Sequence, residues 1–152
     1  MKLKSNKKKF SSDGKILYCG TDSGEIAIFS IVDANLQSII SKLDKNQTLG
    51  PISCLNIVDF HNKKCLLIAQ TDGVCLLVSL PKADDKSLKC AADRFLLVDT
   101  HAQYITQIDQ NHALILSRNS NLYLANFESK TTELAIVQDG IDGKISGIEF
   151  PK

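Results

Sequence analysis

The sequence predicts an all-β fold, an incomplete β-propeller of about three four-stranded blades. Three segments share one order, in which an apolar strand is followed by a polar tight turn and a second apolar strand; they cover residues 16–29, 65–78 and 113–127. Their turns recur about every fifty residues, which is close to the length of one propeller blade. An ordinary β-sandwich also has short strands and frequent turns, but the fixed order of the repeats favours the propeller.

Each of the three hairpin turns carries residues that tolerate positive φ, as tight hairpins require. The predicted turn residues are Gly20, Asp22, Gly24, Asp72, Gly73, Asn119 and Asn121. The two aspartates offer carboxylates that could coordinate calcium, but hydrogen bonds to their own turn backbone are the favoured interpretation. We therefore predict that these residues shape the blades and hold no metal.

The remaining strands complete the blades around these hairpins. A short strand-like pattern recurs at residues 52–60, 104–109 and 145–150, and a further apolar element at 36–40, 94–98 and 132–137. Counted outward from the ring axis, the chain is then expected to open on a second strand near Ile16. The expected organisation is a basic flexible tail at 1–13 and a partial propeller at 14–152, with blades at 14–43, 50–99 and 103–138 and one more first strand at 144–150.

Closed propellers have about four to eight blades, so three blades predict an incomplete ring. Further blades or a second copy of the chain would have to complete it, because an exposed strand edge invites association. The regions expected to bind partners are the hairpin turns, the loop at residues 44–50 and the insertion at residues 81–92.

The composition is that of a globular protein, with 43% hydrophobic and 23% charged residues and a net charge of +1. Five cysteines without a CxxC pair indicate reduced, buried thiols. We expect an intracellular protein, because no apolar run approaches the roughly 20 residues that cross a bilayer. Five lysines crowd the first nine residues, so a nucleic-acid-associated protein that uses this N-terminus stays an alternative.

No motif predicts catalysis or a cofactor. Asp99, His101 and Ser117 could form a catalytic triad, but no Gly-x-Ser-x-Gly elbow accompanies them. Residues 84–85 are a carboxylate pair expected on a solvated loop, and residues 140–143 form a glycine turn without the lysine of a P-loop. A propeller hydrolase or ligand binder would need convergent polar side chains on the inner strands, which offer Ser53, Asp59, Thr106, Asp109, Ser146 and Glu149.

Two of the turns carry a family resemblance. Residues 20–24 and 70–73 resemble the Gly-Thr/Ser-x-Asp/Ser-Gly turn of WD-repeat proteins, although the chain has no tryptophan and so lacks the Trp-Asp dipeptide of that family. From Asp13 onward, the order of the motifs resembles three middle blades of the first propeller in the WD-repeat cilia- and flagella-associated proteins of the doublet-microtubule lumen. The segments that carry this likeness are residues 14–26, 49–53, 66–78, 104–108, 120–123 and 148–151.

The resemblance implies a rigid, non-catalytic protein-binding scaffold. Its partners would be tubulin and neighbouring axonemal proteins, and its location would be the cytoplasm or cytoskeleton, in a cilium or flagellum. A WD-repeat adaptor in another cytoplasmic or nuclear complex is the alternative. The chain is much shorter than a protein with two propellers, which leaves its function as an isolated chain open.

Overall fold

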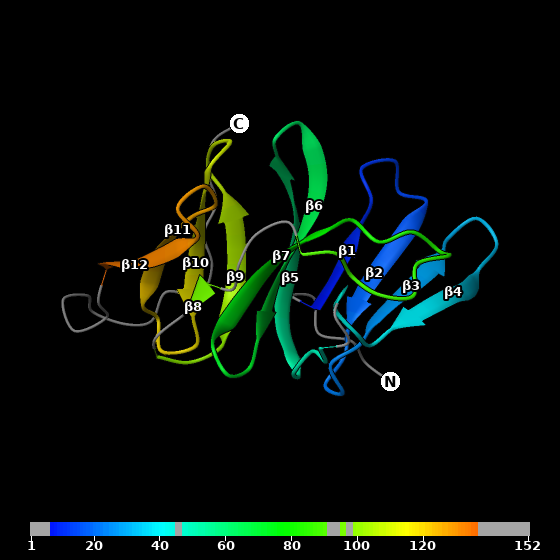
Figure 1. Ribbon diagram of the computed structural model, residues 1–152, viewed down its shortest axis with the longest axis horizontal. Helices are drawn as coiled ribbons and strands as arrows, with labels where there is room; N and C mark the ends of the chain where they lie inside the picture. Colours follow the sequence, from blue (N-terminus) through cyan, green and yellow to red (C-terminus); the bar gives the residue numbers. More distant parts are fainter. Residues whose placement is uncertain (1–6, 45–46, 91–94, 97–98, 137–152) are drawn as a thin grey trace.

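The computed structural model describes residues 7–44, 47–90, 95–96 and 99–136. These residues form three antiparallel, four-stranded sheets that stand side by side (Figure 1). The first sheet contains β1 (Lys8–Phe10), β2 (Ile16–Gly20), β3 (Ile26–Ser30) and β4 (Asn35–Ile40). The second contains β5 (Ile52–Phe60), β6 (Lys63–Gln70), β7 (Val74–Ser79) and β8 (Phe95–Leu96). The third contains β9 (Ala102–Gln107), β10 (His112–Ser117), β11 (Leu122–Asn126) and β12 (Thr131–Ile136).

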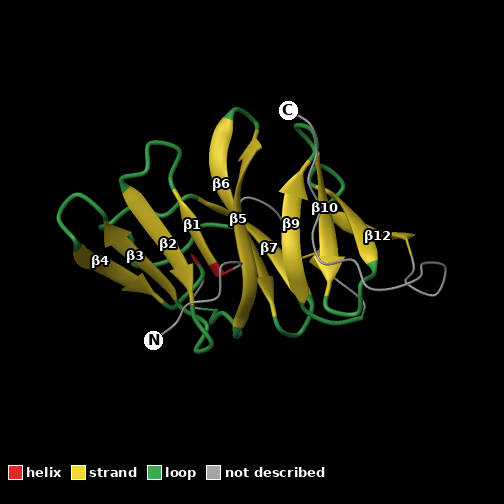
Figure 2. Ribbon diagram, turned by 180° about the vertical axis from the view of Figure 1, so that it is seen from behind, coloured by secondary structure: helices red, strands yellow, loops and turns green. Residues whose placement is uncertain are grey.

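In every sheet, strands that follow each other in the chain are also neighbours in space. Each sheet is therefore a meander of the kind that forms one propeller blade. The first strands of the three blades lie next to one another, because β5 contacts both β1 and β9. Figure 2 shows this arrangement from behind, with β5 between the other two first strands. The predicted partial propeller of three blades is confirmed, and the described residues do not close a ring.

The first blade begins earlier than the sequence indicated. Lys8–Phe10 were assigned to a flexible tail, but they form β1 and pair with β2, with Lys9 opposite Tyr18 and Phe10 opposite Leu17. Lysine side chains do not prevent a strand, because the ladder is made by backbone groups and the long side chains reach solvent. The blade therefore has its first strand. The additional strand predicted at 144–150 lies outside the described residues.

The second blade is buried on both of its faces. Its side chains at Leu66 and Ile68 belong to an apolar cluster shared with the first blade. Their neighbours Leu67 and Ala69 belong to a cluster shared with the third blade. Side chains alternate between the two faces of a strand, so a strand buried on both faces needs an unbroken apolar run. The run from Cys65 to Ala69 meets that need.

Each outer blade packs one face against the second blade, and no other described blade packs against its opposite face. On the first blade, Tyr18 and Ile28 face the second blade, so the alternating residues Leu17, Ala27 and Phe29 face the other way. The two edge strands of the first blade expose apolar side chains on this outer face: Phe10 is 54% exposed and Ile39 is 53% exposed. In a closed ring, such a face packs against the neighbouring blade.

Four of the five cysteines are buried, and none of the five forms a disulfide. Burial raises the pKa of Cys54 and Cys75 to about 12. Cys90 is exposed, so the expectation of uniformly buried thiols is wrong at this position. It lies in the charged insertion at residues 81–92, where its backbone forms a bridge with Val78 while its side chain stays exposed.

This difference predicts a selective thiol reaction. At pH 8, an aromatic disulfide reagent should modify Cys90 rapidly in the folded chain. Cys54 and Cys75 should react only as fast as the chain unfolds, because the thiolate is the nucleophile and burial disfavours it. Mass spectrometry of peptides from a timed reaction measures all three rates. Equal rates for Cys54 and Cys90 would contradict the burial of Cys54.

Candidate protein-binding surfaces

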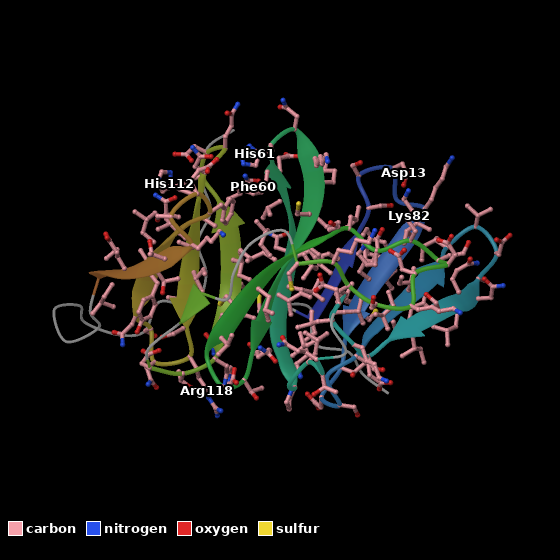
Figure 3. All side chains as sticks on the ribbon, in the orientation of Figure 1. Asp13, Phe60, His61, Lys82, His112 and Arg118 are labelled. Atoms are coloured by element: carbon pink, nitrogen blue, oxygen red, sulfur yellow. The ribbon has the colours of Figure 1, made fainter. Side chains whose placement is uncertain are left out.

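The blades present their turns at two opposite ends, named here as they stand in Figure 1. The lower end carries the turns from β2 to β3, from β6 to β7 and from β10 to β11. The upper end carries the turns from β1 to β2, from β5 to β6 and from β9 to β10. In Figure 3, Arg118 marks the lower end, and Asp13, His61 and His112 mark the upper end. All seven predicted turn residues lie at the lower end.

The three lower-end turns share one backbone feature. Gly24, Gly73 and Ser120 occupy the same place in their turns and have φ values of 79°, 88° and 62°. Two of these three residues with left-handed backbone conformation, Gly24 and Gly73, are therefore among the turn residues predicted from the sequence. In the third turn, Asn119 and Asn121 were the predicted residues, but the left-handed residue is the serine between them. The short side chain of serine fits there because the hydroxyl stays close to its own backbone.

Side-chain oxygens hold these turns closed. Thr21 Oγ1 accepts a hydrogen bond from the Glu25 backbone N–H at 3.1 Å. Ser117 Oγ accepts one from the Asn121 N–H at 3.2 Å. In the middle turn, Asp72 Oδ1 accepts a hydrogen bond from the Val74 N–H at 3.0 Å, as predicted for an aspartate that caps its own turn. The Asp22 carboxylate contacts Lys7 Nζ.

The lower-end turns are also tied to the connections between blades. The Ile52 N–H donates to Thr21 O at 3.0 Å, and the Thr71 N–H donates to Pro51 O at 2.8 Å. In the third blade, the Arg118 N–H donates to His101 O at 3.0 Å. These bonds fix the start of one blade to a hairpin of the same or the preceding blade. The lower end is therefore a rigid surface of backbone turns.

Of the three residues of the possible catalytic triad, Asp99 and Ser117 meet through their side chains, whereas His101 accepts a hydrogen bond through its backbone oxygen. Ser117 Oγ donates directly to Asp99 Oδ2 at 3.0 Å. In a serine triad, the imidazole must stand between the hydroxyl and the carboxylate in order to take the proton. Asn121 also donates to the same Asp99 oxygen. The group therefore anchors the connection before β9 to the turn after β10.

Tyr123 adds to this network. Its side chain is buried, and burial raises its pKa, with the nearby Asp99 charge acting in the same direction. The phenol therefore stays protonated around neutral pH. A neutral phenol, a serine hydroxyl and an asparagine amide surround one carboxylate, which is the arrangement of a structural hydrogen-bond network.

Two of the inner-strand carboxylates named above line open hollows at the upper end, in an arrangement that does not suit catalysis. Asp59 and Asp109 line a hollow of about 310 Å³ at the upper end. Asp59 pairs with Lys64 Nζ at 2.9 Å, and Asp109 pairs with His112 Nδ1 at 2.8 Å. A backbone N–H from Asn111 and the His112 side chain lower the pKa of Asp109. A carboxylate held in its charged form in this way is poorly suited to general acid–base work near neutral pH.

The other polar candidates serve local structure. Ser53 Oγ donates to Ala69 O at 3.2 Å inside the second blade. In the predicted carboxylate pair, Asp85 Oδ2 accepts the Lys82 N–H at 2.7 Å and closes a loop turn. Residues 140–143, Ser146 and Glu149 lie outside the described residues. No group of three or more histidine, cysteine, aspartate or glutamate side chains in the described part of the chain could hold a metal ion.

A cleft of larger volume opens at the upper end between the first and second blades. Its volume is about 560 Å³, within the range of about 300–1,000 Å³ that is typical of ligand pockets. Apolar and weakly polar side chains form much of its lining: Tyr18, Phe60, Cys65, Leu80 and Pro81. The rest of the lining is polar or basic: His61, Lys63, Lys64, Ser79 and Lys82. Of the residues that line this cleft, only Pro81 and Lys82 belong to a binding region predicted from the sequence, the insertion at residues 81–92.

The fold and these two ends define a partial β-propeller. No family model matches the sequence, and no curated protein matches it. Among solved structures, the chain is similar to the β-propeller domain of Cps50 (Swd1) from Myceliophteria thermophila, with a TM-score of 0.63 and 16% sequence identity. The match covers 92% of this chain and 42% of that chain, so this chain spans less than half of that structure. At this identity, the likeness shows the fold alone.

In the described part of the chain, no helix has the length and apolar character that crossing a membrane requires.

Proposed function

We propose that the chain is a non-catalytic, protein-binding scaffold of the WD-repeat type. The propeller architecture carries this proposal, because its blades hold two sets of turns rigidly at opposite ends. Binding residues commonly lie on loops that a rigid scaffold positions. The motif of residues 20–24 supports the WD-repeat assignment, since its glycine takes the left-handed turn position.

The partners of such a scaffold include the chain segments that supply the remaining blades of the ring. The outer face of the first blade exposes Phe10, Leu36 and Ile39, and we propose that further blades or a second copy of the chain cover it. The match to 42% of a propeller chain supports this, because two copies would approach the size of one propeller. Light scattering should then give a mass of twice 16.7 kDa for the chain, or an assembly with a blade-containing partner.

The scaffold proposal is tested by cross-linking and reconstitution. The purified chain is cross-linked in an extract, and each protein recovered by mass spectrometry is then purified and titrated into the chain by calorimetry. We expect at least one protein to bind with defined stoichiometry and to cross-link to an end of the blades. If no purified protein binds, or if the chain turns over a small molecule from the extract, the proposal is wrong.

A narrower proposal concerns the location. The order of motifs from Asp13 onward supports a place in the ciliary or flagellar axoneme, with tubulin among the partners. The test is co-sedimentation of the purified chain with doublet microtubules, together with mass spectrometry of isolated axonemes. Absence from axonemes and from the microtubule pellet would remove this assignment and favour an adaptor in another cytoplasmic or nuclear complex. If the chain instead binds a nucleic acid, and this binding requires residues 1–9 and weakens steeply as salt is added, the alternative of a nucleic-acid-associated protein is favoured.

A further inference from the structure

We propose that the upper-end cleft between the first and second blades binds a short segment of a partner protein that carries a carboxylate beside an apolar side chain. This inference rests on the proposed scaffold function and names the partner chemistry of one site. The cleft is separate from the lower-end turns that the sequence singled out. Three features of the described residues support it: an apolar wall of fixed shape, two unpaired ammonium groups, and acidic groups that exclude a polyanion.

The wall is held in place from both blades. Tyr18 comes from β2, and its hydroxyl donates to Pro81 O at 3.3 Å, which joins the first blade to the chain that follows β7. Burial raises the pKa of Tyr18, so the phenol stays neutral and keeps its donor hydrogen. Phe60 comes from the end of β5 and packs edge-on against Phe127 of the third blade, with ring centroids 5.8 Å apart. An apolar ligand group would therefore meet a preformed surface, which reduces the entropic cost of binding.

The charges on the second blade favour an anionic group. Lys64 is paired with Asp59, and His61 Nε2 lies 3.0 Å from Glu128 Oε1. Lys63 and Lys82, in contrast, form no ion pair with any described residue. Both side chains line the cleft. A carboxylate that enters beside the apolar wall would find these two ammonium groups without displacing an existing partner.

The acidic side chains of the same region decide against a nucleic acid. Asp13 and Asp85 lie near enough to Tyr18 for their charges to act on its hydroxyl. Figure 3 shows Asp13 and Lys82 at the same end of the molecule. Nucleic-acid affinity grows with the number of phosphates that basic side chains neutralise. Two unpaired lysines beside two carboxylates suit one or two negative charges and repel a longer polyanion.

The test uses the full chain and a fluorescein-labelled peptide of alternating glutamate and leucine. Fluorescence anisotropy gives its affinity for the wild-type chain and for the variants Lys63→Glu and Lys82→Glu. We expect each charge reversal to weaken binding about tenfold, because it places a repelling charge against the bound carboxylate. A peptide with glutamine in place of glutamate should bind about tenfold more weakly to the wild-type chain as well.

The matched control is Arg118→Glu, which makes the same change of charge at the opposite end of the molecule. It should leave the peptide affinity unchanged, and circular dichroism should give all variants the same thermal midpoint within a few degrees. Equal losses for Arg118→Glu and Lys63→Glu would overturn the proposal, as would an undiminished affinity of the glutamine peptide. Tighter binding of a single-stranded oligonucleotide than of the acidic peptide would overturn it too.

The two proposals fail in different ways. If a protein partner identified by reconstitution binds the wild-type chain and the Lys63→Glu variant equally well, and the acidic peptide does not bind, then the cleft inference is wrong and the scaffold function stands. If no partner is found at all, the scaffold function is wrong.

Discussion

Replacing Gly24 with alanine should lower the free energy of unfolding by about 3 kcal/mol or more. Gly24 has a φ of 79°, and an alanine in the left-handed region costs about 1–2 kcal/mol. A Cβ atom at this position would also lie 2.2 Å from Leu49 O and 3.0 Å from Gly50 O. These are backbone atoms of the connection between two blades, so the clash can be relieved only by moving that connection.

The chain provides a matched control for this prediction. Gly14 has a φ of 73°, yet no heavy atom lies within 4 Å of the Cβ that alanine would add. Gly14→Ala should therefore cost only the backbone term, about 1–2 kcal/mol. Urea unfolding followed by circular dichroism measures both variants. If the two substitutions cost the same, the close contact of the lower-end turn with the blade connection is not as the structure shows it.

The contrast between Gly24 and Ser120 explains what the sequence could reveal about the turns. Glycine and asparagine stand out in a sequence because they are the residues that most readily take positive φ. Ser120 takes the same conformation, but serine is common in every kind of loop and gives no such signal. The flanking asparagines were chosen instead. The hairpin itself was located correctly, because its two apolar strands determine where the turn must be.

The first strand was missed for a different reason. The prediction at residues 1–13 followed the density of lysines, whereas β1 forms because its backbone completes a ladder with β2. Such pairing is a tertiary effect that strand propensity does not encode. The apolar run in β6, unlike the lysine-rich β1, was recognisable as a strand from the sequence. Its unbroken apolar residues indicate that the strand is buried. Which of them face the first blade and which face the third depends on the strand register, in which Leu67 lies opposite Leu77.

The cleft could not be predicted from spacing along the chain. Its residues come from β2, from the region of the β5–β6 turn and from the chain after β7, more than sixty positions apart at the extremes. Lysines are common on protein surfaces, so Lys63 and Lys82 carry no signal of their own. Their meaning depends on which carboxylates lie beside them in the folded chain. Some phosphate-binding and metal-binding motifs, in contrast, have a local spacing that a sequence displays.

Replacing Phe127 with alanine should also lower the free energy of unfolding strongly, because this side chain packs between the second and third blades. The Phe127 side chain is fully buried in the cluster between these blades, against the ring of Phe60. Truncating a buried phenylalanine removes its apolar contacts and leaves a cavity, which costs about 3–5 kcal/mol. We expect the urea midpoint to fall accordingly. A loss below about 1 kcal/mol would mean that the two blades do not unfold as one cooperative unit.

Phe10→Ala is the control, and it also reports on what covers the first blade. Phe10 is 54% exposed, so its truncation should cost the isolated chain less than about 1 kcal/mol. If a second copy packs on this face, the same substitution should make the light-scattering mass depend on concentration and fall toward 16.7 kDa on dilution. Phe127→Ala acts through the interior of one chain, so the pair separates stability within the blades from the association that completes the ring.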